Sequence, residues 1–76
     1  MTPNNYKEEA NNYAAKKLRE FRLKRKLTRV ELSEKLNLAH QQIQKYESGR
    51  DRIAIGTLAL ICEALKVKPN AFFERF

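Results

Sequence analysis

Apolar residues recur along the first third of the chain at intervals of three and four, the period of an amphipathic helix. The stripe runs through Tyr6, Ala10, Ala14, Leu18 and Phe21, and Arg22 falls on it as well. It predicts a helix over residues 13–25. Pro3 and the four asparagines within residues 1–12 favour a frayed, polar N-terminal extension, into which the helix can continue back to about Asn5.

Residues 29–48 carry two shorter stripes with a turn between them. The inward positions are Leu32 and Leu36 in the first stripe, and Ile43 and Tyr46 in the second. Asn37 lies between the stripes, and asparagine tolerates the left-handed conformation better than any residue except glycine. Ser33 is small enough for the second helix to cross closely over the first. We therefore expect two short helices joined by a tight turn.

The ends of these two helices carry their own signals. Thr28, with Glu31 three residues later, forms a capping box at the start of the first helix. Ala39 opens the second helix and cannot cap it, which costs about 1 kcal/mol. Gln42 is placed to bond back to the Ala39 amide and replace part of that cap. Gly49 suits the position just after the end of the second helix.

The last third of the chain predicts two further helices after a loop over residues 50–54. The first covers about residues 55–66, with Leu58, Ile61, Cys62 and Leu65 turned inward. The second is short, begins at Pro69 and ends in Phe72, Phe73 and Phe76. With no internal repeat or linker, residues 13–76 are expected to form one all-α domain, a compact bundle of five short helices.

The net charge and the single cysteine limit the partners and the cellular compartment that can be expected. The 76 residues carry a formal net charge of +7, and such a basic domain favours nucleic acid, an anionic membrane surface or an acidic protein as partner. The single cysteine cannot form an intrachain disulfide, which fits a reducing cytoplasm. We expect no signal peptide and no membrane span, because the N-terminus is polar and no apolar run is long enough.

The outward face of residues 40–48 is polar and fits the major groove of duplex DNA. The residues of this helix outside its apolar stripe are His40, Gln41, Gln42, Gln44, Lys45 and Glu47, and its glutamine, histidine and lysine side chains place hydrogen-bonding heads on long stems. Together with the turn before it, this face makes residues 29–48 resemble the helix-turn-helix of the xenobiotic-response-element/Cro-type family, which includes phage repressors. The resemblance implies a lambda-repressor-like domain.

The family pattern matches at particular positions. It asks for a small residue at Ser33, a turn residue at Asn37 and a branched aliphatic at Ile43, followed by a Glu-x-Gly sequence that is found at residues 47–49. The similarity extends over roughly residues 14–73. Two departures are the serine at position 33, where the family usually has alanine, and Ala39, where a capping serine or threonine is usual.

The resemblance implies roles for individual side chains. The candidates for base contact are His40, Gln41 and Lys45, with Gln44 as a secondary one, and those for phosphate contact are Arg29, Gln42, Ser48, Arg50 and Arg52. Gln41 can pair bidentately with adenine, and Lys45 can reach guanine. Arg22 and Glu47 are expected to form a largely buried ion pair that fixes the recognition helix on the first helix.

A symmetric homodimer is also expected, because one recognition helix reads only a few base pairs. The family solves this with two-fold dimers whose recognition helices enter major grooves about 34 Å apart. Leu60 lies on the outer side of its helix, and Phe73 and Phe76 end a helix too short to bury three phenylalanines. We expect these three residues to form a self-complementary apolar patch.

These observations predict a sequence-specific, double-stranded DNA-binding transcriptional regulator, acting as a small repressor or controller protein. The alternative is an antitoxin-type protein that binds a toxin and its own operator. A non-specific RNA or membrane binder is a further rival. One cysteine and one histidine give no metal site, and no catalytic serine arrangement or glycine-rich phosphate loop is recognisable. We therefore expect a non-enzyme without a cofactor.

Overall fold

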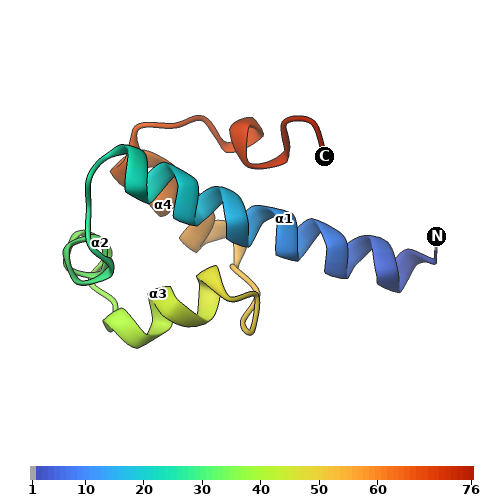
Figure 1. Cartoon of the computed structure of the whole chain (residues 1–76), viewed down its shortest axis with the longest axis horizontal. Coiled ribbons are helices and arrows are strands. Elements are labelled where there is room, and N and C mark those ends of the chain that lie inside the picture. Colours follow the sequence, from blue (N-terminus) through green and yellow to red (C-terminus); the bar gives the residue numbers. More distant parts are fainter. Residues whose placement is uncertain (1) are drawn as a thin grey trace.

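A long N-terminal helix, α1 (Pro3–Lys24), spans the molecule in the computed structural model, which describes residues 2–76 (Figure 1). The N-terminal extension is helical from Pro3 onward and not frayed, so the helix continues through it two residues beyond the limit near Asn5 expected from the sequence. Thr2 caps it by accepting a hydrogen bond from the backbone N–H of Asn5 at 3.2 Å. The ring of Tyr6 also contacts that of Phe76, with centroids 5.3 Å apart, so the extension gains a partner from the other end of the domain.

The next two helices, α2 (Arg29–Leu36) and α3 (His40–Glu47), form the turn that the sequence predicts. Thr28 and Glu31 make both hydrogen bonds of the capping box, at 3.0 and 2.8 Å. Asn37 adopts the left-handed conformation with φ 55°, which ends α2 and turns the chain. In contrast, α3 has no side-chain cap. The hydrogen bond expected between the Gln42 side chain and the Ala39 amide is not formed.

The C-terminal third contains α4 (Ile55–Leu65) and η1 (Pro69–Phe73). The fifth helix expected from the sequence is thus a single 3-10 segment that ends at Phe73, so the five helices comprise four α-helices and one 3-10 helix in the described residues. Lys66 takes the left-handed conformation at the end of α4, and Arg25 Nε donates to the Leu65 carbonyl at 2.8 Å. This bond satisfies a carbonyl that a helix end leaves without an intrahelical partner.

All five elements contribute to one core. Its fully buried side chains are Leu18 from α1, Leu32 from α2, Ile43 from α3, Ile61 and Leu65 from α4, and Phe72 from η1. The Phe21 and Phe72 rings meet edge to face at 5.2 Å, which holds η1 on α1. The all-α class expected from the sequence is confirmed. Among residues 2–76, no helix combines the length and the apolarity needed to cross a membrane.

Candidate nucleic-acid interface

One face of α3 anchors the helix, and the opposite face is open to solvent. Ile43 and Tyr46 are buried in the core at 0% and 8% exposure. The exposed residues are the four candidates for base contact, His40, Gln41, Gln44 and Lys45. Gln41, Gln44 and Lys45 line a hollow of about 290 Å³ together with Ser48 and Arg50. The structure therefore brings polar side chains together on a helix whose position is set by its buried face.

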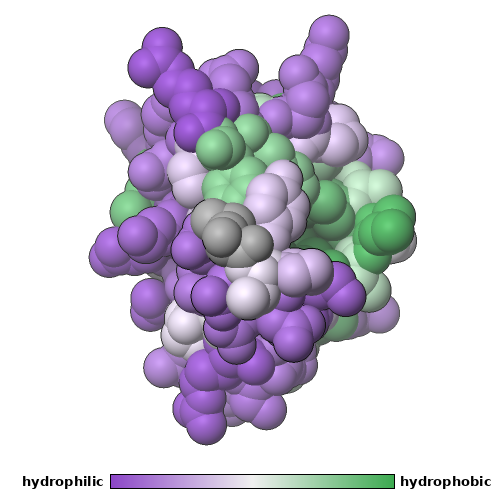
Figure 2. Space-filling view, turned by 90° about the vertical axis from the view of Figure 1, so that its right-hand side faces the viewer, coloured by the Kyte–Doolittle hydropathy of each residue, from purple (hydrophilic) through white to green (hydrophobic). Residues whose placement is uncertain are grey.

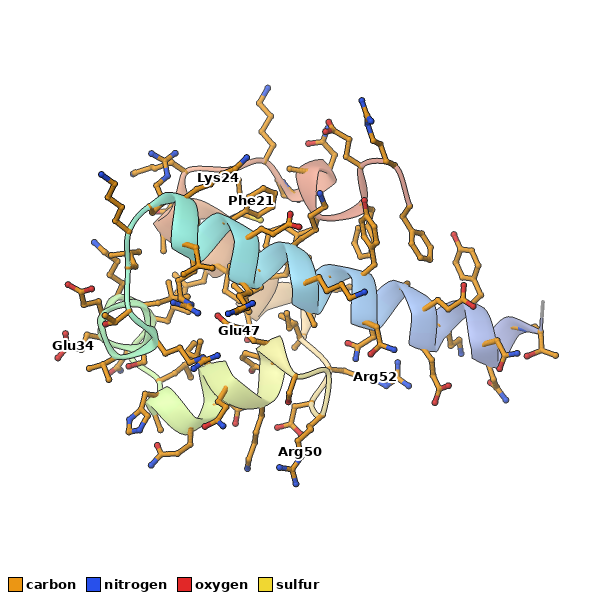
Figure 3. The ribbon with its side chains drawn as sticks, viewed as in Figure 1. Phe21, Lys24, Glu34, Glu47, Arg50 and Arg52 are labelled. Carbon is orange, nitrogen blue, oxygen red and sulfur yellow. The ribbon has the colours of Figure 1, made fainter. Side chains whose placement is uncertain are left out.

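A buried carboxylate fixes the C-terminal end of this helix. Arg22 Nε donates to Glu47 Oε2 at 2.6 Å, and the Nη2 atom of Arg22 donates to Glu47 Oε1 at 3.1 Å. The two side chains are only 7% and 3% exposed. Arg22 also donates to the Leu27 carbonyl at 2.8 Å, so its guanidinium holds α3 and the end of α1 together. Figure 3 shows Glu47 between α3 and α1.

Arg29 joins this ion pair as a third member. Its Nε lies 3.0 Å from Glu47 Oε1, while its side chain keeps 43% exposure at the start of α2. The sequence offered Arg29 only as a phosphate candidate and gave no sign of the contact with Glu47. With Nε engaged, the exposed part of the guanidinium is held in a defined orientation beside α3 and retains donors for a further partner.

The loop after α3 is tied to the helix by a second polar contact that the sequence did not reveal. Gln42 Nε2 donates to Asp51 Oδ2 at 2.9 Å, and Ser48 Oγ donates to the Lys45 carbonyl at 3.1 Å. Like Arg29, the phosphate-contact candidates Gln42 and Ser48 thus have partners within the protein. Arg50, another such candidate, is exposed on the same loop (Figure 3).

The first half of α1 lies against this loop from the other side. Asn11 Nδ2 donates to the Gly49 carbonyl at 3.3 Å. Gly49 has φ 78°, and a Cβ at this position would lie 2.7 Å from the Asn12 Oδ1 atom. The backbone conformation therefore favours glycine here, and a larger residue would make the Asn12 carboxamide move. Arg52 points from the loop toward this part of α1 (Figure 3).

The three residues expected at a dimer interface are exposed in the single chain. Leu60, Phe73 and Phe76 are 45%, 44% and 42% exposed. Phe73 and Phe76 lie together, with ring centroids 6.3 Å apart. Leu60 instead lines a hollow with Lys35, Glu63, Ala64 and Lys66, to which neither phenylalanine contributes. Phe76 also packs on the ring of Tyr13 at 5.3 Å. Figure 2 shows exposed apolar surface on the face around the start of α1, in a largely hydrophilic surround.

The described residues offer little for metal or thiol chemistry. Among residues 2–76, no group of three or more His, Cys, Asp or Glu side chains is arranged to hold a metal ion. Cys62 is buried, and this burial raises the pKa of its thiol, which keeps the sulfur protonated and unreactive at neutral pH.

Comparison with known proteins agrees with this arrangement. A family model described as helix-turn-helix matches residues 18–72, which include α2, α3 and α4 in full. The chain belongs to the helix-turn-helix family. Its resemblance to the xenobiotic-response-element/Cro-type members is thereby confirmed. An uncharacterized HTH-type transcriptional regulator of Rickettsia conorii is 43% identical over 63 residues, which is 83% of this chain and 50% of that protein. The chain thus spans about half the length of the curated relatives it matches.

Solved helix-turn-helix structures share the fold. The clp gene regulator ClgR of Corynebacterium glutamicum superposes with a TM-score of 0.80 at 25% identity, over 84% of this chain and 83% of that chain. The restriction-modification controller protein C.AhdI of Aeromonas hydrophila gives a TM-score of 0.77 at 21% identity, over 82% of this chain and 94% of that chain. The second match concerns the fold alone.

Proposed function

We propose that the chain is a sequence-specific, double-stranded DNA-binding transcriptional regulator that inserts α3 into the major groove. The observation that carries the proposal is the exposed polar face of α3, set in place by two buried side chains and by the Glu47 ion pairs. A helix positioned in this way can present side chains to base edges without rearranging. Family membership and relatives called HTH-type transcriptional regulators support the same role.

The proposed role is binding rather than catalysis, because the family and fold are those of DNA-binding regulators. The protein would act in the cytoplasm, as a small repressor or controller that occludes a promoter or contacts polymerase. No cofactor is needed for such a mechanism.

Gln41 and Lys45 are the side chains that we expect to read bases, with His40 and Gln44 beside them. Gln41→Ala and Lys45→Ala should each relax specificity at one base position per half-site and weaken binding to the cognate site by about 1–3 kcal/mol. Lys68→Ala is the matched control for the lost charge, because Lys68 is exposed and belongs to the segment between α4 and η1, which runs on the other side of α1 from α3 (Figure 1). Selection from random duplexes followed by titration measures both effects, and equal weakening by Gln41→Ala on all sequences would contradict base readout.

Phosphate contacts should make binding steeply salt-dependent. Arg29, Arg50 and Arg52 are exposed around the C-terminal end of α3, and we propose that they contact the DNA backbone, with Gln42 and Ser48 supporting the loop. If about four to six phosphates are neutralised per protomer, the log–log slope of affinity against salt is roughly −4 to −5. A slope near zero would remove the DNA-binding proposal itself.

We further propose that the regulator binds a pseudo-palindromic operator as a symmetric homodimer. Phe73, Phe76 and Leu60 are exposed apolar side chains available for such a contact. Phe76 already packs on α1, so Phe73→Glu combined with Leu60→Glu is the cleaner test. The double variant should sediment as a folded monomer and lose cooperative binding to a palindrome. A wild-type chain that is monomeric at about 50 μM, well above the affinities typical of specific complexes, and that binds a half-site equally well, would overturn the dimer.

A further inference from the structure

A polar hollow of about 310 Å³ lies between the first half of α1 and the loop that follows α3. It is lined by Glu8, Asn11, Asn12, Gly49, Arg50 and Arg52. Its α1 side precedes the part of the chain that the family model matches, which begins at residue 18. The hollow is therefore formed partly by a segment that the family match leaves without a role.

The charges around the hollow favour an anion. The carboxylate of Asp51, which lies between the two arginines in sequence, accepts from Gln42 on α3, and Asp51 does not line the hollow. Among the lining residues, Arg50 and Arg52 thus face only one acidic side chain, that of Glu8. The ion pairs found in residues 2–76 involve neither arginine, so both guanidinium groups retain their donors for an external partner.

The walls of the hollow are held close together. The hydrogen bond from Asn11 to the Gly49 carbonyl joins α1 to the loop, and the Asn12 carboxamide oxygen would lie 2.7 Å from a Cβ at Gly49. Carboxamide N–H groups and guanidinium forks are both donors suited to phosphate oxygens. A phosphate group in this hollow would meet donors from two segments whose separation is already set.

The hollow continues the proposed recognition surface. Arg50 lines this hollow and also the one on the outward face of α3, together with Gln41 and Lys45. A DNA strand that contacts the outward face of α3 can therefore extend from one hollow to the other across the Arg50 side chain. We propose that the hollow binds a backbone phosphate of the DNA duplex, with Arg50 and Arg52 as its cations, Asn11 and Asn12 as its wall, and Glu8 limiting its affinity. This inference rests on the proposed DNA-binding function.

Two neighbouring glutamates provide a matched test. Glu8→Gln and Glu9→Gln change the net charge equally, both positions are exposed, and only Glu8 lines the hollow. Removing a carboxylate about 6 Å from a phosphate in water should strengthen duplex binding about threefold at low salt. Glu8→Gln should show this gain, and Glu9→Gln should show a clearly smaller one. Arg52→Gln should weaken binding on cognate and random duplexes alike, and should make the salt slope shallower by about 1.

The result that overturns the inference is an equal gain from both glutamate variants, or an unchanged salt slope for Arg52→Gln. Titrating the wild type with inorganic phosphate while following the amide resonances of Asn11, Asn12 and Gly49 distinguishes the source of the anion. Saturation by free phosphate, with duplex affinity unaffected by Glu8→Gln, would assign the hollow to a small anion and reject the DNA backbone. If specific duplex binding persists while these variants have no effect, only the hollow is rejected. If the wild type binds no duplex at all, the proposed function fails with it.

Discussion

Replacing Glu47 with alanine should destabilise the domain far more than replacing any exposed acid. The Glu47 side chain is 3% exposed and accepts hydrogen bonds from both Arg22 and Arg29. Its removal leaves the Arg22 guanidinium buried with the Leu27 carbonyl as its remaining partner. Breaking a buried ion pair from one side typically costs about 3–5 kcal/mol. Arg29 adds little to this figure, because its side chain is 43% exposed and solvent screens the pair.

That loss is large for a chain of 76 residues, whose total stability is expected to be about 4–11 kcal/mol. A loss of 3 kcal/mol should lower Tm by about 12–24 °C. Urea titrations followed by circular dichroism measure the loss directly, with Glu34→Ala as control because Glu34 is exposed on α2 (Figure 3). Glu47→Gln should fall between the two, since its carbonyl still accepts one N–H. If Glu47→Ala and Glu34→Ala agree within about 1 kcal/mol, the burial argument is refuted.

The remaining predictions use positions with defined geometry. In urea titrations, Gly49→Ala should lower the free energy of unfolding by about 1–2 kcal/mol, because Gly49 has a left-handed φ of 78°. Gly56→Ala should raise it by about 0.5–1 kcal/mol, because a Cβ at this position in α4 meets nothing within 4 Å. The Thr28 backbone N–H, its hydroxyl and Lys35 lower the pKa of Glu31, so this carboxylate stabilises the fold above its unfolded pKa. That contribution is lost as the pH falls through the folded pKa, and Glu31→Gln should flatten the fall in stability measured in acid. Cys62 should react with iodoacetamide much more slowly in the native protein than in urea, as followed by mass spectrometry.

Much of the fold could be predicted from the sequence because it depends on neighbours in the chain. The capping box at Thr28 and the left-handed Asn37 are local preferences, and both stand where the pattern placed them. The start of α1 was predicted only in part, because the apolar stripe reached back to about Asn5 while the helix begins at Pro3. Local composition indicated fraying, whereas Tyr6 contacts Phe76, a residue 70 positions away. The short helix after Pro69 was correctly expected, but periodicity over so few residues does not distinguish a 3-10 helix from an α-helix.

The candidate site, too, could be predicted from the sequence only in part. The outward face of α3 follows from the burial of Ile43 and Tyr46, which the spacing indicated. The pairing of Arg22 with Glu47 came from the family pattern. The contacts of Gln42 with Asp51 and of Arg29 with Glu47 are choices among several available polar partners. Such choices depend on how the loop and α2 are oriented, and nothing in the spacing of these residues indicated them.

The packing of α1 against the C-terminal segment has a consequence for synthesis on the ribosome. Phe21 on α1 meets Phe72, and the Tyr13 hydroxyl donates to the Glu74 carbonyl, across about fifty to sixty residues of intervening chain. These contacts of α1 therefore wait for partners that are translated much later, whereas α2 and α3 can pair with each other, and α3 with Arg22 of α1, as soon as they have emerged. Closing so large a loop is entropically costly until its contacts form. We expect the helix-turn-helix pair to form early on the nascent chain and to dock on α1 through Arg22 and Glu47. The contacts of α1 with the C-terminal segment should complete the domain only after residue 74 is accessible.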